Sequence, residues 1–470
     1  MPGFYNRYAA EYNTMSNILD QIVQTKQQEI AELYRQYDIE SLRPKGALRM
    51  IPEFYAALYE QKKAKKPFFI CEFKRKSPSE GWINEHADLA AQINGYADAG
   101  ASAISVLTDT PWFGGNYDDL SRAREVLHRR GHQRPLLLQK DFILDEIQIY
   151  LAHRAGADII LLIAAILTPE RLQQLRKAAE NLGMGVLTEV HDAAEYEAIA
   201  HLDFPVLGVN NRDLKVFRTS LNRVNVLRQQ AGPRYVISES GIYDYRDFAV
   251  VQGADGFLIG TGLMRAGAQA LRDLAPKKPL FKACGWRTPD ISEMTGADFV
   301  GINFSPVSKR RMTQEVLDQI QIPPHAVAVF YQNTAAEIQA VLEKYPFRRV
   351  QFYAGDVTPE LVRSVRRKVL MAARIRTQED LAALTDYSAD VDMFILDGAV
   401  PGSGQLVEDS LIPDNFPWPF LLAGGIHIDN LSLIGQYRNC IGIDIASGIE
   451  TEGRVDANRV QAIAARLMEI

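Results

Sequence analysis

Two stretches of the chain share one pattern, and this pattern decides the fold. Residues 237–264 begin with Ile-Ser-Glu-Ser-Gly-Ile and end with Gly-Phe-Leu-Ile-Gly-Thr-Gly-Leu-Met. Residues 421–449 begin with Leu-Leu-Ala-Gly-Gly-Ile and end with Gly-Ile-Asp-Ile-Ala-Ser-Gly-Ile. Each stretch predicts an apolar strand that ends in glycine, followed by a second strand that ends in small or hydroxylated residues. Because the last two loops of a (β/α)₈ barrel hold a phosphate in this way, the repeat predicts two barrels, two phosphate sites and two reactions.

The rest of the chain alternates short apolar runs with longer amphipathic segments. Such runs predict strands buried on both faces, and their alternation with helical segments requires parallel pairing through crossovers. Eight runs of this kind occupy the first half: 68–73, 102–107, 136–141, 159–163, 185–190, 206–211, 235–240 and 256–260. Eight more occupy the second half: 280–285, 299–304, 326–331, 350–355, 369–375, 393–398, 420–425 and 442–447.

The predicted fold class is therefore α/β, with two fused (β/α)₈ TIM barrels. A chain of 470 residues is long for one domain, and 47% apolar residues suffice to fill two cores. We expect the barrels to occupy residues 1–275 and 280–470, because Pro-Lys-Lys-Pro at 276–279 cannot continue a helix. Residues before about 66 precede the first strand and predict extra helices over one mouth of the first barrel.

Composition and charge argue against several classes of protein. A net charge of −6 does not suit a nucleic-acid-binding protein, which presents a clustered basic surface. The longest apolar run, residues 159–167, is about half the length that spans a membrane, and the polar helical pattern at 17–34 is not a signal peptide. Cys71, Cys284 and Cys440 are scattered, so we expect a cytoplasmic protein without disulfides or a zinc site.

Catalytic groups of a (β/α)₈ barrel lie at the carboxyl ends of its strands. Several strands predicted in the first half end in charged or amide side chains: Glu72, Lys74, Lys140, Asp141, Glu189, Asn210, Asn211 and Glu239. Partial desolvation is expected to lower the pKa of the lysines and to raise that of the glutamates, toward values useful for proton transfer. Asp141 is expected to orient Lys140.

The motifs around these residues resemble those of indole-3-glycerol phosphate synthase. They are Cys-Glu-Phe-Lys-Arg-Lys-Ser-Pro-Ser from residue 71, Ser-Val-Leu-Thr-Asp from 105, Lys-Asp-Phe-Ile from 140, Leu-Thr-Glu-Val-His from 187, Val-Asn-Asn-Arg-Asp-Leu from 209, Ile-Ser-Glu-Ser-Gly-Ile from 237 and Phe-Leu-Ile-Gly-Thr from 257. The resemblance covers about residues 15–272. It implies closure of an anthranilate-substituted deoxyribulose phosphate to indole-3-glycerol phosphate, with loss of CO₂ and water.

The resemblance implies roles for three of the strand-end groups. Ring closure needs a proton on the carbonyl oxygen while the aromatic carbon attacks, and Lys140 is the candidate general acid. Lys74 is expected near the substrate carboxylate and the departing hydroxyl. Glu189 is the candidate base for the later proton loss.

The other residues of the first site are expected to bind rather than to transfer protons. Those that orient the lysines and the sugar hydroxyls are Glu72, Asn210 and Glu239. Phe113 and Phe142 are candidates to pack on the anthranilate ring, and Arg212 to contact the carboxylate or the substrate chain. The candidate phosphate ligands are Ser77, Ser240, Gly241, Gly260 and Thr261.

In the second half, a cysteine and an aspartate end strands on opposite sides of the predicted barrel. Cys284 ends the run at 280–285, and Asp397 ends the run at 393–398. A thiol has a reference pKa of about 8.5, so it needs help to act as a base at neutral pH. The sequence does not rank Lys282 against the phosphate loops as the source of that help.

Over about residues 280–468 the chain resembles phosphoribosylanthranilate isomerase, and the order of the halves resembles a fused tryptophan-pathway enzyme. The resemblance implies an Amadori rearrangement of N-(5′-phosphoribosyl)anthranilate, whose product is the substrate of the first barrel. Asp397 is expected to protonate the furanose oxygen, Cys284 to remove the C2′ proton, and Arg310 to pair with the anthranilate carboxylate. The expected phosphate ligands are Gly424, Gly425, Ser447 and Gly448.

The second half departs from this family at three sites. Trp286 and Arg287 replace an aliphatic residue and threonine, Tyr353 stands where the fourth strand usually ends in histidine, and Pro401 replaces a glycine. These departures leave open a synthase whose second barrel is weak or non-catalytic. A different phosphosugar isomerase and a non-catalytic phosphate-binding protein are further alternatives. The cysteine–aspartate pair argues against the first of these, and the lysine–glutamate cluster against the second.

The sequence contains no dinucleotide-binding or P-loop glycine motif, so we expect neither a cofactor nor a metal. Proton transfers suffice for both reactions. The expected partners are small phosphorylated anthranilate-sugar substrates, with no nucleic acid and no membrane, and the expected state is a monomer.

Overall fold

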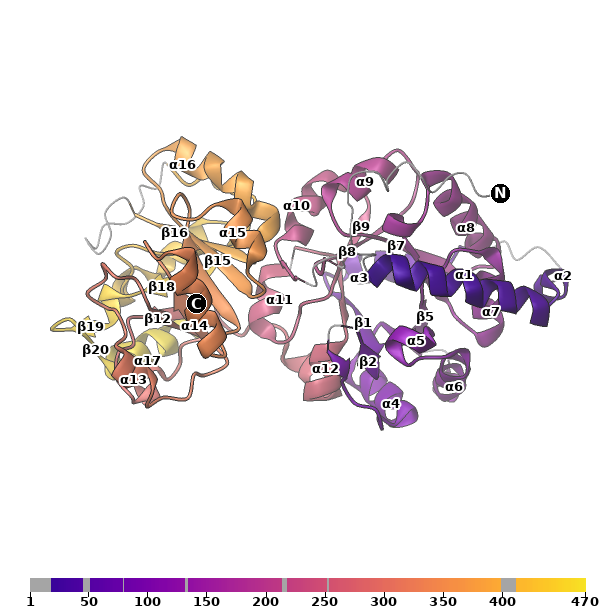
Figure 1. The fold of residues 1–470 in the computed structure, drawn as a ribbon, viewed down its shortest axis with the longest axis horizontal. Coiled ribbons are helices and arrows are strands. Elements are labelled where there is room, and N and C mark those ends of the chain that lie inside the picture. Colours follow the sequence, from indigo (N-terminus) through magenta and orange to yellow (C-terminus); the bar gives the residue numbers. More distant parts are fainter. Residues whose placement is uncertain are drawn as a thin grey trace.

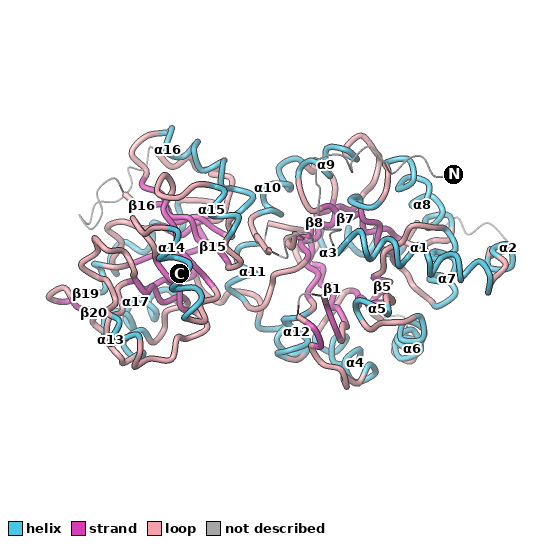
Figure 2. The backbone as a smooth tube through the Cα atoms, viewed as in Figure 1, coloured by secondary structure: helices cyan, strands magenta, loops and turns pink. Residues whose placement is uncertain are grey.

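Two closed barrels of eight parallel strands make up the computed structural model, which describes residues 18–44, 51–78, 80–131, 134–213, 218–251, 253–398 and 411–470. The barrels lie side by side along the long axis of the molecule (Figure 1). Strands occupy the centre of each half and helices lie outside them (Figure 2). The predicted fold class is confirmed.

The strands agree with the predicted runs to within three residues at each end. Those of the first barrel are β1 (Phe68–Phe73), β4 (Ala103–Leu107), β5 (Leu136–Lys140), β6 (Ile159–Ile163), β7 (Gly185–Val190), β8 (Val206–Asn210), β9 (Tyr235–Glu239) and β10 (Gly256–Ile259). Those of the second are β11 (Leu280–Cys284), β12 (Phe299–Asn303), β13 (Ala326–Val329), β14 (Arg349–Tyr353), β15 (Lys368–Arg374), β16 (Met393–Asp397), β17 (Phe420–Leu422) and β18 (Cys440–Ile445). The barrels close because β1 pairs with β4 and β10, and β11 with β12 and β18.

Helices connect the strands and cover the barrels. In the first half they are α1 (Ile18–Gln36), α2 (Ile39–Leu42), α3 (Glu53–Lys63), α4 (Leu89–Ala99), α5 (Thr110–Phe113), α6 (Tyr117–His128), α7 (Glu146–Ala155), α8 (Pro169–Asn181), α9 (Ala193–Ile199), α10 (Arg223–Gln230), α11 (Tyr245–Val251) and α12 (Thr261–Ala266). In the second half they are α13 (Gln314–Leu317), α14 (Ala335–Lys344), α15 (Pro359–Ser364), α16 (Gln378–Ala382) and α17 (Ala457–Leu467).

Shorter elements complete the described chain. The 3₁₀ turns are η2 (Ala164–Ile166), η3 (Ala268–Asp273), η4 (Ile291–Met294), η5 (Ala383–Asp390), η6 (Ile428–Gln436) and η7 (Ser447–Ile449). Two small antiparallel pairs join β2 (Lys76–Ser77) to β3 (Gly81–Trp82) and β19 (Glu450–Thr451) to β20 (Arg454–Val455).

Local sequence explains where the helices begin and end. Helix α7 starts at a capping box of Asp145 and Gln148 and stops at Gly156, whose φ of 92° only glycine adopts readily. The strands form because their apolar side chains are buried on both faces, and all five residues of β6 are buried. The sequence pattern and the burial thus specify the same elements.

The N-terminal helices are divided between the two ends of the first barrel. Leu19, Ile22 and Lys26 form the buried face of α1, which lies across the mouth at the carboxyl ends of the strands (Figure 1). Helix α3 lies at the opposite end, where Phe54 packs on Phe68 at the start of β1 with 5.6 Å between ring centroids. The expected extra helices are present, and they close both ends rather than one.

Helices α10 and α11 of the first half face the second barrel (Figure 1). The hydroxyl of Ser220 donates to the carbonyl oxygen of Val391 at 2.7 Å, and that of Tyr245 donates to Asp298 at 2.5 Å. Among the described helices, none combines the length and the apolar composition that a bilayer span requires.

Candidate active sites

A cavity opens at the carboxyl ends of the strands in the first barrel. It contains every residue that the sequence predicts for the first site: Glu72, Lys74, Ser77, Phe113, Lys140, Phe142, Glu189, Asn210, Arg212, Glu239, Ser240, Gly241, Gly260 and Thr261. Helix α1 adds the apolar side chains of Ile18, Leu19 and Ile22. The fold therefore gathers these residues at one mouth.

Lys140 ends β5, and its ammonium group lies between two carboxylates. Its Nζ atom is 3.1 Å from Oε2 of Glu189 on β7 and 3.3 Å from Oε2 of Glu239 at the end of β9. The side-chain amide of Asn210 donates to Oε1 of Glu189 at 3.2 Å. All four side chains are largely buried, so solvent screens these charges only weakly.

A second ion pair lies in the same cavity. Nζ of Lys74 is 2.5 Å from Oε1 of Glu72. Glu72 lies near the end of β1, and Lys74 directly follows that strand. Gly260 leaves the room for this pair, because a Cβ atom there would lie 2.2 Å from Oε1 of Glu72. Gly260 is thus needed for close packing as well as for the predicted phosphate site.

The pKa directions differ in part from the expectation. Burial opposes the charge of Lys140, but Glu189, Glu239 and Glu72 outweigh it and raise the pKa of Lys140 above its ordinary value. Burial also opposes the charge of Glu189, yet Lys140 and His191 hold the pKa of Glu189 at about 2. The expectation of a lowered pKa for Lys140 and a raised pKa for Glu189 is therefore wrong. Burial, reinforced by the charge of Glu189, does raise the pKa of Glu239 well above its usual range.

The remaining predicted groups lie around this charged cluster. The rings of Phe113 and Phe142 are 6.0 Å apart between centroids and inclined at 36°, which leaves apolar surface facing the cavity. Nη2 of Arg212 lies 3.6 Å from Oε1 of Glu80. The backbone N–H of Arg212 donates to Oδ1 of Asn210.

The predicted phosphate end is a tight turn after β9 packed against the loop after β10. Ser240 and Gly241 have φ values of 65° and 87°, and the conformation of Ser240 is strained for a residue with a Cβ atom. The side-chain amide of Asn211 donates to the carbonyl oxygen of Ser240 at 3.2 Å and holds the turn. A Cβ atom on Gly262 would lie 2.8 Å from the carbonyl oxygen of Ile242, so glycine allows the two loops to meet.

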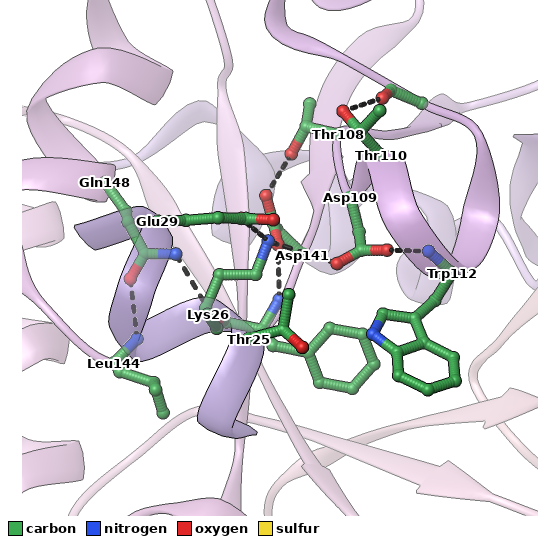
Figure 3. Close-up of polar contacts among 12 residues, drawn as sticks. Thr25, Lys26, Glu29, Thr108, Asp109, Thr110, Trp112, Asp141, Leu144 and Gln148 are labelled. Carbon is green, nitrogen blue, oxygen red and sulfur yellow. Dashed lines mark hydrogen bonds and ion pairs between the residues drawn. The ribbon is translucent and has the colours of Figure 1, made fainter. Parts of the chain in front are cut away.

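Asp141 does not orient Lys140. It pairs instead with Lys26 of α1, whose Nζ lies 2.9 Å from Oδ1 of Asp141 and 3.1 Å from Oδ2 of Asp109 (Figure 3). The hydroxyl of Thr108 and the N–H of Phe142 also donate to Asp141. The expectation was wrong because the partner of Asp141 lies 115 residues earlier, on a helix that sequence reasoning could not place.

Lys26 links α1 to two segments that line the cavity. Asp109 accepts hydrogen bonds from the N–H groups of Trp112 and Phe113 and so begins α5, while Asp141 lies between Lys140 and Phe142. The side chain of Lys26 is only 3% exposed, and a third carboxylate, Glu29, lies 2.6 Å from Nζ. The aspartates raise the pKa of Lys26 even though burial opposes its charge. Lys26 therefore stays charged and holds α1 over the cavity.

Replacing Lys26 with Met is expected to detach α1 from the first barrel. The variant leaves Asp109 and Asp141 buried without their cation, which typically costs about 3–5 kcal/mol. We expect a lower thermal midpoint and faster hydrogen–deuterium exchange across α1, both measurable on the full chain.

A matched control is Arg35→Met on the same helix. Arg35 is 75% exposed and pairs with the exposed Glu32, so its loss is expected to change stability by about 1 kcal/mol or less. Equal exchange rates in the two variants would show that Lys26 does not hold the helix.

In the second barrel, Cys284 ends β11 and Asp397 ends β16, so both lie at the same rim. Burial raises the pKa of the Cys284 thiol, and the nearby ammonium of Lys282 opposes this increase. Lys282 itself is fully buried and donates to Oδ1 of Asp444 at 2.8 Å. Burial and the charge of Asp444 raise the pKa of Asp397 to about 6. The site thus combines a neutral thiol with a carboxyl group that retains a proton in mildly acidic solution.

Arg310 forms a bidentate ion pair with Glu450, which is not among the predicted site residues. Its Nε and Nη2 atoms lie 2.6 Å and 2.7 Å from the two carboxylate oxygens. A Cβ atom on Gly285 would lie 3.1 Å from Cδ of Arg310, so the glycine after Cys284 lets the arginine approach. The ion pair with Glu450 orients the guanidinium at the rim, and the Nη1 group of Arg310 takes part in neither of the two contacts.

Arg374 is a second cation at this rim, and it packs on the rings of Tyr331 and Tyr353. The guanidinium of Arg374 lies 4.6 Å from the ring centroid of Tyr331 and 5.6 Å from that of Tyr353. An open cavity lies over these residues at the ends of β13, β14 and β15. Burial raises the pKa of Tyr353, and the charges of Cys284, Asp444 and Asp397 raise it further.

The two loops that the sequence predicts for the second phosphate also meet. Gly424 and Gly425 have φ values of 77° and 62°, and a Cβ atom on Gly448 would lie 2.3 Å from the carbonyl oxygen of Ile426. Ser447 and Gly448 form η7 directly after β18. The contact between Gly448 and Ile426 repeats the one between Gly262 and Ile242, so the sequence repeat corresponds to a repeated loop structure.

The departures from the isomerase family lie in different places. Trp286 is fully buried, and its indole N–H donates to the carbonyl oxygen of Asp290 at 3.1 Å, so it fills the core. Arg287 donates to the carbonyl oxygen of Lys309 at 3.0 Å. Tyr353 lies at the rim, as described above. Pro401 lies outside the described residues.

Sequence reasoning also missed His191, next to Glu189 in space. Its Nε2 atom is 3.3 Å from Oε1 of Glu189, and Nδ1 is 3.0 Å from Oε2 of Glu195. His191 could have been selected from the sequence, because it ends the Leu-Thr-Glu-Val-His motif two residues after Glu189. Glu450 had a similar signal in the second repeat, whereas nothing in the sequence connects Lys26 to Asp109 and Asp141.

Comparison with known proteins assigns both halves. The chain matches the family model of indole-3-glycerol phosphate synthase over residues 19–274 and that of N-(5′-phosphoribosyl)anthranilate isomerase over residues 282–466. Tryptophan biosynthesis protein TrpCF of Vibrio parahaemolyticus is 34% identical over 473 residues, which cover 95% of this chain and 93% of the relative. Indole-3-glycerol phosphate synthase of Bacillus cereus is 42% identical over 258 residues, 54% of this chain and 95% of the relative. The chain therefore belongs to the TrpCF family: it is a bifunctional enzyme of tryptophan biosynthesis with a synthase domain and an isomerase domain.

Proposed function

We propose that the two barrels catalyse consecutive reactions. The second barrel, residues 280–470, rearranges N-(5′-phosphoribosyl)anthranilate to 1-(2-carboxyphenylamino)-1-deoxyribulose 5-phosphate. The first barrel, residues 1–275, closes that product to indole-3-glycerol phosphate and releases CO₂ and water. The observation that carries the proposal is the buried Lys140–Glu189–Glu239 cluster at one end of a cavity whose other end is a glycine-rich turn.

In the first barrel, Lys140 acts as the general acid. The surrounding carboxylates raise its pKa, so the ammonium form persists at neutral pH and a proton is available for the substrate carbonyl. Lys74 is close enough to Glu72 to be held in place, and it neutralises the substrate carboxylate until CO₂ leaves. Glu189, whose pKa of about 2 keeps it ionised, accepts the proton that is lost when the indole becomes aromatic.

The rest of the first site binds the substrate. Phe113 and Phe142 offer apolar surface to the anthranilate ring, and Asn210 and Glu239 contact the sugar hydroxyls. The backbone around Ser240, Gly241, Gly260 and Thr261, with Ser77, holds the phosphate. The hydroxyl oxygen of Ser77 is buried and has no hydrogen-bond partner among the described residues, which suits a ligand-binding role.

In the second barrel, Asp397 donates a proton to the furanose oxygen, and the ring opens to a Schiff base. Cys284 then removes the proton from C2′, and the resulting enolamine tautomerises to the ketone. The thiol must first ionise, and the charge of Lys282, followed by that of Arg310, favours the thiolate. Glu450 holds Arg310 so that its Nη1 group faces the anthranilate carboxylate, while Gly424, Gly425, Ser447 and Gly448 hold the phosphate.

Separate steady-state assays of the two reactions on the full-length protein test this function. Turnover of both substrates is expected. Turnover of the ribulose phosphate alone would support the alternative that the protein is a synthase whose second barrel is weak or non-catalytic. Turnover of neither would reject the proposal.

The pH dependence of the isomerase tests the proposed acid and base together. Asp397 has a raised pKa of about 6 and must be protonated to open the ring, whereas Cys284 must be ionised and burial raises the pKa of its thiol. Above pH 6 the protonated fraction of Asp397 falls by about tenfold per pH unit while the thiolate fraction of Cys284 rises by the same factor, so kcat/KM is expected to stay level until the thiol itself ionises. Below about pH 6 only the thiolate fraction changes, and kcat/KM is expected to fall by about tenfold per pH unit as the pH decreases. A pH–rate profile at low substrate concentration measures this shape, and Asp397→Asn should show little activity at any pH. A kcat/KM that keeps rising about tenfold per pH unit between pH 6 and 8 would contradict the role of Asp397 as the acid.

A further inference from the structure

One lysine of the second barrel touches the loop that forms the predicted phosphate end of the first cavity. Lys368 begins β15, at the end of the second barrel opposite its own active site. Its Nζ group donates to the carbonyl oxygen of Gly241 at 2.7 Å and lies 2.5 Å from Oδ1 of Asp247. Nζ is also 5.1 Å from the ring centroid of Tyr243. Gly241 and Tyr243 both line the cavity of the first barrel.

Asp247 ties the same loop to a second cation of the isomerase domain. Nη2 of Arg349, the first residue of β14, donates to Oδ1 of Asp247 at 2.9 Å. The other carboxylate oxygen accepts the N–H of Tyr243 at 3.0 Å. Asp247 and Arg349 are buried, and the side chain of Lys368 is only 13% exposed. The turn from Gly241 to Tyr243 is therefore held between the two barrels by protected ionic contacts.

The contact with Gly241 also fixes the direction of a donor that faces the cavity. In a trans peptide, the carbonyl oxygen of Gly241 and the N–H of Ile242 point in opposite directions. Because the oxygen points at Lys368, the N–H of Ile242 points away from the second barrel, and Ile242 lines the cavity. Within the described residues this N–H donates no hydrogen bond to the protein. A cation on the carbonyl side polarises the peptide and strengthens the N–H as a donor to an anion.

We propose that Lys368 is a positioning residue of the synthase site, through which the isomerase domain completes the phosphate-binding loop of the synthase. The inference rests on the proposed function of the first cavity. It predicts that affinity for the phosphorylated substrate depends on a side chain from the other catalytic domain.

Docking of the barrels does not by itself explain this contact. The domains are joined elsewhere by the hydrogen bond from Tyr245 to Asp298 and by that from the N–H of Leu221 to Asp392, at 3.0 Å. Neither contact involves the turn from Gly241 to Tyr243. Lys368 is thus distinguished from these interface contacts by its direct bond to a residue that lines the cavity.

The test is Lys368→Met in the full-length protein. The variant removes the ammonium group and keeps the length of the side chain, Arg349 still pairs with Asp247, and Asp392 still accepts the N–H groups of Leu221 and Val369. We expect the synthase KM to rise about tenfold, the value for loss of one charge-assisted hydrogen bond, with kcat changed less than twofold. The inhibition constant of inorganic phosphate against the synthase should rise by a similar factor.

Two controls separate positioning from a general loss of structure. The isomerase kinetics of the same variant should be unchanged, because Lys368 lies at the far end of that barrel. Tyr245→Phe removes an interface hydrogen bond that does not involve the loop, and it should leave both activities near wild type. An equal rise of the synthase KM in Tyr245→Phe and Lys368→Met would overturn the proposal in favour of simple domain docking.

Direct binding of inorganic phosphate distinguishes failure of this inference from failure of the proposed function. If the wild-type protein binds phosphate but has no synthase activity, the function is wrong, and weaker binding by Lys368→Met still supports the contact. If the wild type is an active synthase and Lys368→Met matches it in KM and in phosphate binding, the inference alone is wrong.

Discussion

Replacing Lys140 with Met is expected to lower the synthase kcat by about 10³-fold or more, because general acid catalysis by a positioned group contributes roughly 10²–10⁴. Methionine retains the length of the side chain but has no proton to give. The change also removes the charge that Glu189 and Glu239 share, so their protonation will adjust to the loss. Substrate binding should remain measurable, because the phosphate turn and the aromatic rings do not depend on Lys140.

Two controls complete this test. The isomerase rate of Lys140→Met should equal that of the wild type, because Lys140 belongs to the other barrel, and this shows that the chain is folded. Lys62→Met is a matched control in the first barrel, since Lys62 is about half exposed and pairs with Asp255 outside the cavity. A synthase rate within a fewfold of wild type in Lys140→Met would reject Lys140 as the acid.

Replacing Cys284 with Ala is expected to lower the isomerase kcat by about 10³-fold, because the variant removes the base proposed to take the C2′ proton. The thiol lies in contact with Lys282, and its loss leaves the pair of Lys282 and Asp444 in place. The fold is therefore expected to survive the substitution. Ser at this position should be nearly as inactive, because a hydroxyl ionises far less readily than a thiol.

The chain supplies a matched control for the cysteine variant. Cys440 begins β18, at the opposite end of the same barrel, and Cys440→Ala is expected to leave the isomerase rate near wild type. The synthase activity of Cys284→Ala, measured on the ribulose phosphate, should also be normal. An isomerase rate that does not change in Cys284→Ala would reject the thiol as the base.

The sequence was sufficient to predict the strands, the two barrels and the groups at their mouths. Buried parallel strands are apolar along their whole length, so an apolar run such as that of β6 shows where a strand lies in the sequence. A strand in a closed parallel barrel can place its last side chain only at the mouth. Polar residues that end such runs, such as Lys140 and Glu189, must therefore come together, and the structure places their charged atoms 3.1 Å apart.

Pairings within the mouth were beyond the sequence. Asp141 was expected to serve Lys140, its neighbour in the chain, whereas the structure pairs it with Lys26. The direction of the pKa shift of Lys140 depended on how many carboxylates surround it, and three of them outweigh burial. A motif gives the kinds of residue that meet, but neither their number within Coulombic range nor their distances.

The sequence by itself determined which chemical groups each barrel presents at its mouth, because strand periodicity and strand ends are local properties of the chain. Only the tertiary structure decided which charged groups pair, in which direction burial and neighbouring charges shift their pKa values, and that Lys368 of one domain contacts Gly241 of the other. The physical reason is that ion pairing and desolvation depend on distances of a few ångströms between segments that are far apart in the sequence, and the sequence separation of two segments does not indicate whether they are in contact.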